Sequence, residues 1–307
     1  MRRDLRGRKV RTIAVFAAVG ALLLAGCSGD DGDKADPTTT STTVGSSTPP
    51  TTGSSADKLH ILVSNDDGYA ADGIDALVQG LGDLDNVDVV VVAPLDQQSG
   101  QGGRTTLGPL PVTDVTTKSG YPAKAVAGFP ADSVRVALDE LKVEADVVIT
   151  GINAGQNLGP ILDVSGTVGA ARAAVARGIP ALAVSQGSGA PEYQYEVAVP
   201  AVLDWVRDHR DQLLDGKLDP VVTNLNVPSC AKGQMRGLAE VPTDPTGDAT
   251  ASIGPQDCAS TVAFSPEMGE VEAFVNGYAT INEVPAEPKT PADVYPAGGA
   301  TTTSSGG

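Results

Sequence analysis

Apolar positions along the chain repeat with two alternating periods, that of a buried strand and that of an amphipathic helix. The first strand signal is the short β-branched run 61–63, which ends abruptly in an Asn-Asp-Asp-Gly turn. Helical spacing follows at once in a set of apolar residues that consists of Ile74, Leu77, Val78, Leu81 and Leu84. A strand, a tight turn and a helix form the first unit of an open α/β sheet.

The same alternation continues through most of the chain. Runs that are apolar on both faces predict further strands at 87–93, 145–150, 179–184 and 220–227. Helical segments lie between them, and the segment 109–127 predicts a polar hairpin. Strands with two apolar faces are typical of parallel sheets covered by helices. The pattern therefore predicts an α/β fold with a mainly parallel sheet.

The first 26 residues are typical of a secretory signal and not of a folded domain. Six basic residues precede the apolar segment 13–24, which is too short for a comfortable transmembrane helix. Small residues then lead to Cys27, as in the lipobox of bacterial lipoproteins, where the cysteine is lipidated. We therefore predict that the protein is an exported lipoprotein. The lipid on Cys27 would anchor it to the extracytoplasmic side of the membrane.

Two segments of low apolar content flank the predicted domain. Residues 27–57 consist almost wholly of Asp, Gly, Ser, Thr and Pro, and the tail 286–307 has a similar composition. Neither segment can bury an apolar core, so both are predicted to be disordered, the first as a tether. The segment between them, 58–285, is long enough for one sizeable α/β domain.

The chain is strongly acidic. Its formal net charge is −17, and removal of residues 1–26 takes it to about −22. Nucleic-acid backbones need a basic surface, so the charge excludes a nucleic-acid duplex as a partner. It does not exclude a small phosphate that is held through a metal ion.

Two cysteines remain after the signal, Cys230 and Cys258. An even pair in an exported protein favours a disulfide. The alternative is two buried thiols, because the sequence does not give the distance between them.

Asp66 and Asp67 stand side by side where the first predicted strand ends. Open α/β sheets bind their ligands at the carboxyl ends of the strands. Two adjacent carboxylates repel each other there, and a hard divalent cation supplies the compensating charge through oxygen ligands. On these residues alone, a cation site and a solvated turn are both open.

Glycines, amides and hydroxyls also follow two later strands. The loop 96–106 comes after the second strand, and the loop 151–159 follows the strand 145–150. Ser165 and Thr167 then stand where they could cap an alanine-rich helix, whose positive end is suited to phosphate. Ordinary N-capping is the alternative. All three strand ends could lie on one rim of the sheet.

In these segments the sequence resembles the SurE family of survival-protein nucleotidases. The likeness runs from about His60 to Ile281, and several motifs follow one another in the order of the family. The matching segments are Ser64-Asn65-Asp66-Asp67-Gly68, Gln98-Ser99-Gly100, Gly128-Phe129-Pro130-Ala131-Asp132-Ser133, Gly151–Gly159, Ser165–Arg172, Ile179–Ser185 and Asn224–Pro228.

The resemblance implies a Rossmann-like three-layer α/β fold with a small β-rich C-terminal extension. It also implies a phosphomonoesterase that uses one divalent cation per subunit, Mg²⁺ or Mn²⁺. Carried over position by position, the metal ligands are Asp66, Asp67, Ser99 and Asn153. The phosphate-binding residues are Asn157, Ser165, Gly166 and Thr167.

Asp66 and Asp67 are also the catalytic candidates. The metal would lower the pKa of a bound water, and either carboxylate could take the proton of that water. A covalent aspartyl-phosphate on one of them is the alternative mechanism. The chain has only two histidines, His60 and His209. A histidine-based phosphatase or a serine triad is therefore disfavoured, because each needs a catalytic histidine.

The implied substrates are nucleoside 5'-monophosphates, with 3'-monophosphates and other small phosphomonoesters left open. The implied assembly is a homodimer or a higher homo-oligomer. The alternative from another class is a lipid-anchored protein that binds nucleotides or phosphate without turning them over. All four ligand positions are present, which favours the enzyme.

Overall fold

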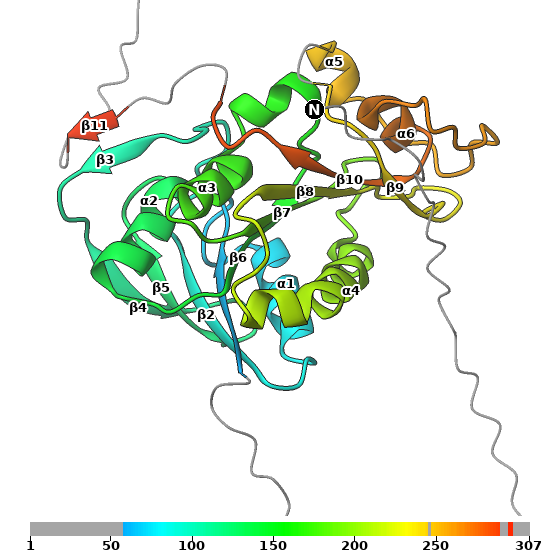
Figure 1. Cartoon of the computed structure of the whole chain (residues 1–307). Coiled ribbons are helices and arrows are strands. Elements are labelled where there is room, and N and C mark those ends of the chain that lie inside the picture. Colours follow the sequence, from blue (N-terminus) through cyan, green and yellow to red (C-terminus); the bar gives the residue numbers. More distant parts are fainter. Residues whose placement is uncertain (1–57, 245–246, 289–293, 297–307) are drawn as a thin grey trace, which may run out of the picture.

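The structure is a computed structural model that describes residues 58–244, 247–288 and 294–296 (Figure 1). The predicted signal peptide and tether lie outside the described residues. Within the described part of the chain, no helix combines the length and the apolar character that a membrane span needs.

Most strands belong to one central sheet, which has nine strands in the described part of the chain. In chain order the strands are β1 (Leu59–Ser64), β2 (Val87–Pro94), β3 (Thr105–Leu107), β4 (Val112–Thr116), β5 (Pro122–Val126), β6 (Val147–Ala154), β7 (Ala181–Gln186), β8 (Val222–Val227), β9 (Leu238–Glu240), β10 (Ala279–Val284) and β11 (Val294–Pro296).

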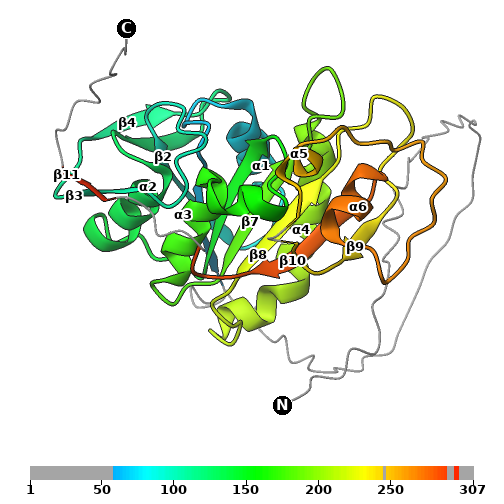
Figure 2. The same ribbon diagram turned by 90° about the horizontal axis from the view of Figure 1, so that it is seen from above.

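The sheet has the order β4-β5-β2-β1-β6-β7-β8-β10-β9. Each neighbouring pair from β5 to β8 is parallel, whereas β4 and β10 run antiparallel to β5 and β8. The predicted mainly parallel sheet is therefore confirmed, and β4 and β5 form the predicted hairpin. Seen from above, β4 and β9 lie at opposite ends of the sheet (Figure 2).

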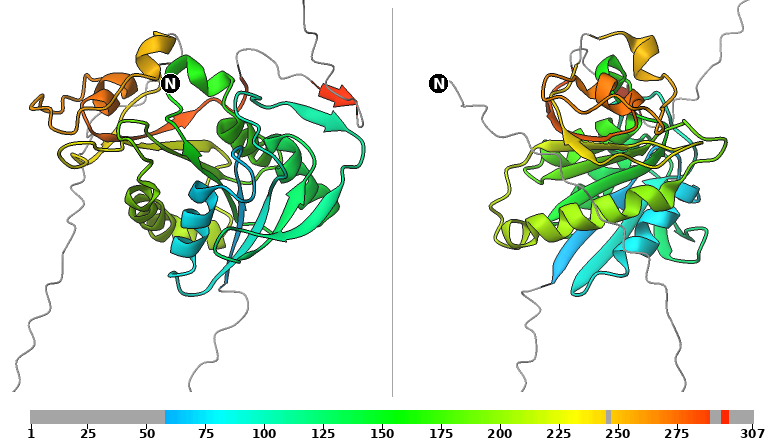
Figure 3. Two further views of the ribbon diagram at one scale, coloured as in Figure 1. Left: turned by 180° about the vertical axis from the view of Figure 1, so that it is seen from behind. Right: turned by 90° about the vertical axis from the view of Figure 1, so that its right-hand side faces the viewer.

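Helices cover both faces of the sheet, which gives three layers. They are α1 (Asp72–Leu81), α2 (Pro130–Arg135), the π-helical turn η2 (Val136–Glu140), the 3₁₀ turn η3 (Gly159–Asp163), α3 (Gly166–Val175), α4 (Tyr195–Leu214), α5 (Ala249–Ser252) and α6 (Glu270–Val275). The contacting pair α1 and α4 lies on one face, and the contacting pair α2 and α3 lies on the other (Figures 1 and 3).

The two apolar faces of β1 explain this arrangement. Ile61 and Val63 pack into the core beneath α1 and α4, whereas Leu62 packs into the core beneath α2 and α3. All three side chains are 0–1 % exposed. Because side chains alternate along a strand, a run that is apolar on both faces requires a helix on each side.

Strand β6 continues past the residue at which the sequence predicts its end. It was expected to stop at Thr150, but it runs through Gly151 to Ala154, with a register shift between Thr150 and Asn153. Gly151 has a φ of 126°, and a Cβ atom on it would lie 2.2 Å from the carbonyl oxygen of Val184. Glycine thus marks a bulge and a close approach to β7, and not the end of the strand.

The C-terminal part extends the sheet and forms a third, smaller core. Strands β9 and β10 join the edge beyond β8, and α6 packs against β10. The apolar side chains of this core are those of Ala239, Val241, Met268, Ala273 and Tyr278. The predicted disulfide is confirmed: Cys230 and Cys258 are bonded, with their Cα atoms 5.6 Å apart.

The tail 286–307 departs from the prediction at three residues. Val294–Pro296 form β11, which pairs in parallel with β3. The prediction of disorder rested on low apolar content, but backbone pairing with a strand edge needs no apolar side chain. Residues 289–293 and 297–307 of this tail lie outside the described residues.

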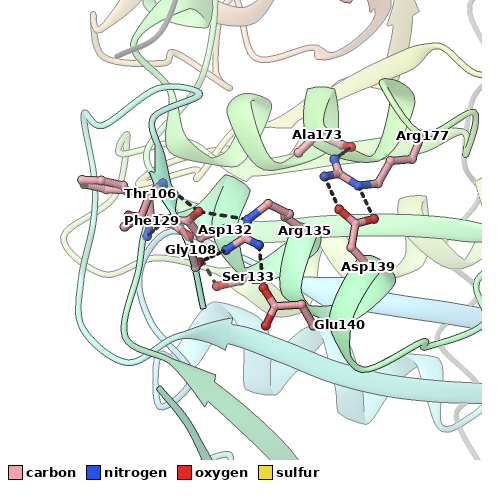
Figure 4. A network of polar contacts seen from close by, with 10 residues as sticks. All are labelled: Thr106, Gly108, Phe129, Asp132, Ser133, Arg135, Asp139, Glu140, Ala173 and Arg177. Atoms are coloured by element: carbon pink, nitrogen blue, oxygen red, sulfur yellow. Dashed lines mark hydrogen bonds and ion pairs between the residues drawn. The ribbon is translucent and has the colours of Figure 1, made fainter. Parts of the chain in front are cut away.

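Asp132 fixes the start of α2 (Figure 4). Its carboxylate is fully buried and accepts hydrogen bonds from the backbone N–H of Phe129 at 3.0 Å and of Thr106 at 2.9 Å. Arg135 lies 3.4 Å from the same carboxylate and also pairs with Glu140. The motif Gly128–Ser133 thus caps α2 and fastens β3 to it.

Replacing Asp132 with alanine is expected to lower the free energy of unfolding by about 3 kcal/mol, because two buried N–H groups lose a charged acceptor. Urea unfolding measures the change. Asp114→Ala is the matched control, since Asp114 is exposed and its pairing with Lys124 is worth less than about 1 kcal/mol. Equal unfolding midpoints for the two variants would contradict the role assigned to Asp132.

Candidate functional site

The Asp66–Asp67 pair lies at the topological switch point of the sheet. The sheet places β2 on one side of β1 and β6 on the other, so the loops after β1 and β6 leave the same edge in different directions. Ligands of doubly wound sheets bind at this point. The predicted location of the pair, at the carboxyl end of the first strand, is therefore where a ligand site is expected.

A short turn holds the two carboxylates in place. The Asn65 side chain donates from Nδ2 to the carbonyl oxygen of Gly68 at 2.9 Å and accepts from the Gly68 N–H at 3.2 Å. Gly68 has a φ of 96°, a left-handed conformation that favours glycine. The turn is thus closed by its own first side chain, which fixes the backbone that carries Asp66 and Asp67 at the end of β1.

Asp66 contacts the N-terminus of α3 directly. Thr167 donates its hydroxyl to Asp66 Oδ1 at 2.6 Å, and the Thr167 side chain is fully buried. A Cβ atom on Gly166 would lie 2.6 Å from Cβ and 2.8 Å from Oδ2 of Asp66, so only glycine fits there. Burial, followed by the negative charge of Asp67, raises the pKa of Asp66 to about 6, although the bond from Thr167 opposes this shift.

Asp67 is held from two other strand ends. Its Oδ2 accepts the backbone N–H of Ala154 at 3.0 Å, at the end of β6. Ser99, in the loop after β2, lies near enough for its side chain to influence the same carboxylate. Both the Ala154 N–H and the Ser99 side chain lower the pKa of Asp67, but burial is the larger influence and raises it. The loops after β1, β2 and β6 therefore meet at this carboxylate.

Asn153 completes the set of predicted metal ligands. Its Nδ2 donates to the carbonyl oxygen of Gly155 at 2.7 Å, which fixes the orientation of the amide. Its Oδ1 is buried and has no hydrogen-bond partner among the residues that the structure describes. A buried oxygen without a partner is costly unless it binds something else, such as a cation. Asp66, Asp67, Ser99 and Asn153 thus offer two carboxylates and two neutral oxygens, a donor set that fits Mg²⁺ or Mn²⁺.

The start of α3 has the features of an anion site. Ser165 is the N-cap and accepts the N–H of Val168 at 3.1 Å, as the N-capping alternative required. Gly166 and Thr167 are the first helical residues, whose N–H groups have no acceptor within the helix. Thr150, on β6, donates to the carbonyl oxygen of Thr167 at 2.9 Å and fixes the helix start to the sheet. Capping and phosphate binding are thus compatible here.

Asn157 is buried beyond the end of β6. Its Nδ2 donates to the hydroxyl of Ser185 on β7 at 2.8 Å, and its backbone N–H donates to Asn226 Oδ1 at 2.7 Å. Its carbonyl oxygen accepts from the amides of Asn224 and Asn226. The phosphate-binding role of Asn157 stays a prediction, in which its second amide N–H would be the donor.

Sequence reasoning assigned no role to Asn224 and Asn226, which hold the Asn157 backbone. A signal was present, because both are asparagines inside a buried strand, and buried amides need partners. Glu270 gave no such signal. Its fully buried carboxylate accepts the N–H groups of Gly159 at 2.8 Å and Asp244 at 2.9 Å. It thereby attaches α6 to the loop that carries Asn157.

Comparison with known proteins identifies relatives over this region. Residues 61–246 match the family model described as Survival protein SurE. A 5'-nucleotidase SurE of Brevibacillus brevis is 36 % identical over 186 residues, which make up 59 % of this chain and 70 % of that protein. One of Thermosipho melanesiensis is 38 % identical over 183 residues, 58 % and 69 % of the two chains.

The fold is also found in a solved structure. The crystal structure of SurE from Aquifex aeolicus matches with a TM-score of 0.58 and 25 % sequence identity. The match covers 74 % of this chain and 94 % of that chain. The likeness therefore includes nearly all of the neighbour's fold.

Proposed function

Because the chain belongs to the SurE family and is a phosphomonoesterase of the nucleotidase type, we propose that it hydrolyses nucleoside 5'-monophosphates with one divalent cation per subunit. The observation that carries the proposal is the contact between a carboxylate and a helix N-terminus. Thr167 donates to Asp66 at 2.6 Å, and Gly166 leaves no side chain between them. Groups suited to a cation and to a phosphate are thus adjacent.

The four oxygen-bearing residues Asp66, Asp67, Ser99 and Asn153 would hold the cation. A bound divalent cation supplies charge neutralisation for the phosphoryl oxygens and acidifies a water molecule. The Oδ1 of Asn153, which has no partner within the described part of the chain, supports this assignment. One of the two carboxylates would take the proton of the attacking water.

The N-terminus of α3 receives the phosphate. The N–H groups of Gly166 and Thr167 and the positive end of the helix dipole favour an anion there. Ser165 keeps the first turn ordered through its cap, and Asn157 contributes an amide donor. These contacts hold the phosphate beside the carboxylates, and orienting a substrate in this way lowers the barrier to hydrolysis.

Two further parts of the proposal rest on the sequence. The leader and Cys27 support export and anchoring on the extracytoplasmic side of the membrane. The family supports a homodimer or a higher homo-oligomer. The substrates would then be nucleoside monophosphates or other small phosphomonoesters outside the cytoplasm.

Phosphate release from AMP and GMP by the purified protein tests the proposal. We expect release in the presence of Mn²⁺ or Mg²⁺, its loss after addition of a chelator, and its return with excess cation. Release that continues unchanged in the chelator would contradict the role of the cation. Tight nucleotide binding without any release would instead identify a nucleotide-binding protein.

A further inference from the structure

Two stacked tyrosines lie next to the proposed site and have no part in the chemistry described above. Tyr193 and Tyr195 have ring centroids 5.6 Å apart and ring planes inclined by 21°. Tyr195 is the first residue of α4, and Tyr193 precedes it in the loop from β7. Tyr193 is 39 % exposed, so part of its side chain is accessible to a ligand.

The topology places this pair at the same edge of the sheet as the carboxylates. The loop from β7 to α4 leaves the carboxyl end of β7, two strands from β1. A Cβ atom on Gly73, in the first turn of α1, would lie 3.1 Å from Tyr195 Cε1 and 1.9 Å from the carbonyl oxygen of Ile152. The Tyr195 ring therefore packs at the point where α1 meets the residue before Asn153.

The electrostatics agree with this placement. Burial is the main cause that raises the pKa of Tyr195, and the negative charge of Asp67 raises it further. A charge influences a hydroxyl in this way only from nearby. The hydroxyl of Tyr195 is thus near the carboxylate that the proposed function uses, and Tyr193 stacks on the Tyr195 ring.

The residue between the two tyrosines holds them in position. Gln194 accepts the backbone N–H of Cys230 at 2.8 Å and donates to the carbonyl oxygen of Cys230 at 3.4 Å. The Gln194 N–H donates to the hydroxyl of Ser229, which also accepts from Gln186. Cys230 is in turn bonded to Cys258. The loop that carries Tyr193 is therefore held in a fixed position. A ligand that binds to the ring loses little free energy to the ordering of this loop.

We propose that the exposed ring of Tyr193, supported by Tyr195, stacks on the nucleobase of the substrate and thereby selects nucleotides over phosphomonoesters that lack a base. The inference rests on the proposed function and deepens it. A base has a neutral π-face, so an acidic protein does not repel it. A net charge of −17 disfavours the binding of ligands with further negative groups. Stacking on an aromatic side chain contributes about 1–3 kcal/mol of binding free energy per base, and it does not discriminate among the bases.

Kinetics with two matched substrates test the inference. AMP and ribose 5-phosphate share the sugar phosphate, and only AMP carries a base. We expect Tyr193→Ala to lower the ratio of their kcat/KM values about tenfold, mainly through the KM of AMP. Tyr193→Phe keeps the ring and should keep the ratio. Leu141→Ala is the control, because Leu141 is similarly exposed at 37 % but precedes β6 at the opposite edge of the sheet.

Binding of adenosine separates this inference from the proposed function. Adenosine carries the base and no phosphate, so equilibrium dialysis reports stacking without turnover. A tenfold weaker affinity in Tyr193→Ala supports the inference even if the wild-type protein releases no phosphate. An unchanged substrate ratio and an unchanged adenosine affinity in Tyr193→Ala would overturn it, while hydrolysis by the wild-type protein would leave the proposed function intact.

Discussion

Asp67→Asn is expected to lower kcat/KM for nucleoside monophosphates by about 10³-fold or more. The substitution keeps the shape of the side chain and an oxygen that can accept the Ala154 N–H, but it removes a negative charge from the proposed cation site. Charge stabilisation by a metal is worth several kcal/mol, and each 1.36 kcal/mol is about a factor of ten in rate. Steady-state phosphate release over a range of Mn²⁺ concentrations measures the loss.

The stability of the variant distinguishes lost chemistry from lost folding. Burial and the neighbouring carboxylate disfavour the charges of this pair, so without added cation the free energy of unfolding should stay the same or rise in Asp67→Asn. Asp88→Asn is the matched control, because the Asp88 side chain is 47 % exposed and lies at the amino-terminal end of β2. Activity within about fivefold of the wild type, with an unchanged Mn²⁺ requirement, would show that Asp67 has another role.

Gly166→Ala is expected to lower kcat/KM by about 100-fold. The new methyl group would lie 2.6 Å from Asp66 Cβ and 2.8 Å from Oδ2, so the carboxylate or the start of α3 must move. Thr167 would then lose its 2.6 Å bond to Asp66 in its present geometry. A displacement of about 1 Å in such an arrangement can reduce the rate by about 10². Steady-state kinetics with AMP, together with circular dichroism, measures the effect.

A second glycine provides the comparison for this variant. Gly269 precedes α6 with a φ of −76°, and nothing lies within 4 Å of the position of its Cβ atom. Gly269→Ala should therefore keep its kcat/KM within about twofold of the wild type, with a loss of about 1 kcal/mol in stability because alanine is a poorer N-cap than glycine. Equal kinetics for the two alanine variants would contradict the tight contact between Gly166 and Asp66.

The fold was largely predictable because its signals are local. Ile61, Leu62 and Val63 show by themselves a strand that is apolar on both faces, and this demands helices on both sides of a sheet. The extent of β6 was not predictable, since Gly151 in a sequence indicates a break as readily as a bulge. The pairing of β11 with β3 was not predictable either, because backbone hydrogen bonds between strands do not require a particular amino-acid composition.

For the candidate site, the sequence determined which chemical groups stand at the strand ends, including Asp66, Asp67 and Asn153. Only the tertiary structure decided which of these groups meet. Asp67 and Ala154 are 87 residues apart, Asp66 and Thr167 are 101 apart, and Gly159 and Glu270 are 111 apart. Periodicity and turn chemistry act over a few residues, whereas contacts at this separation depend on the order of strands in the sheet.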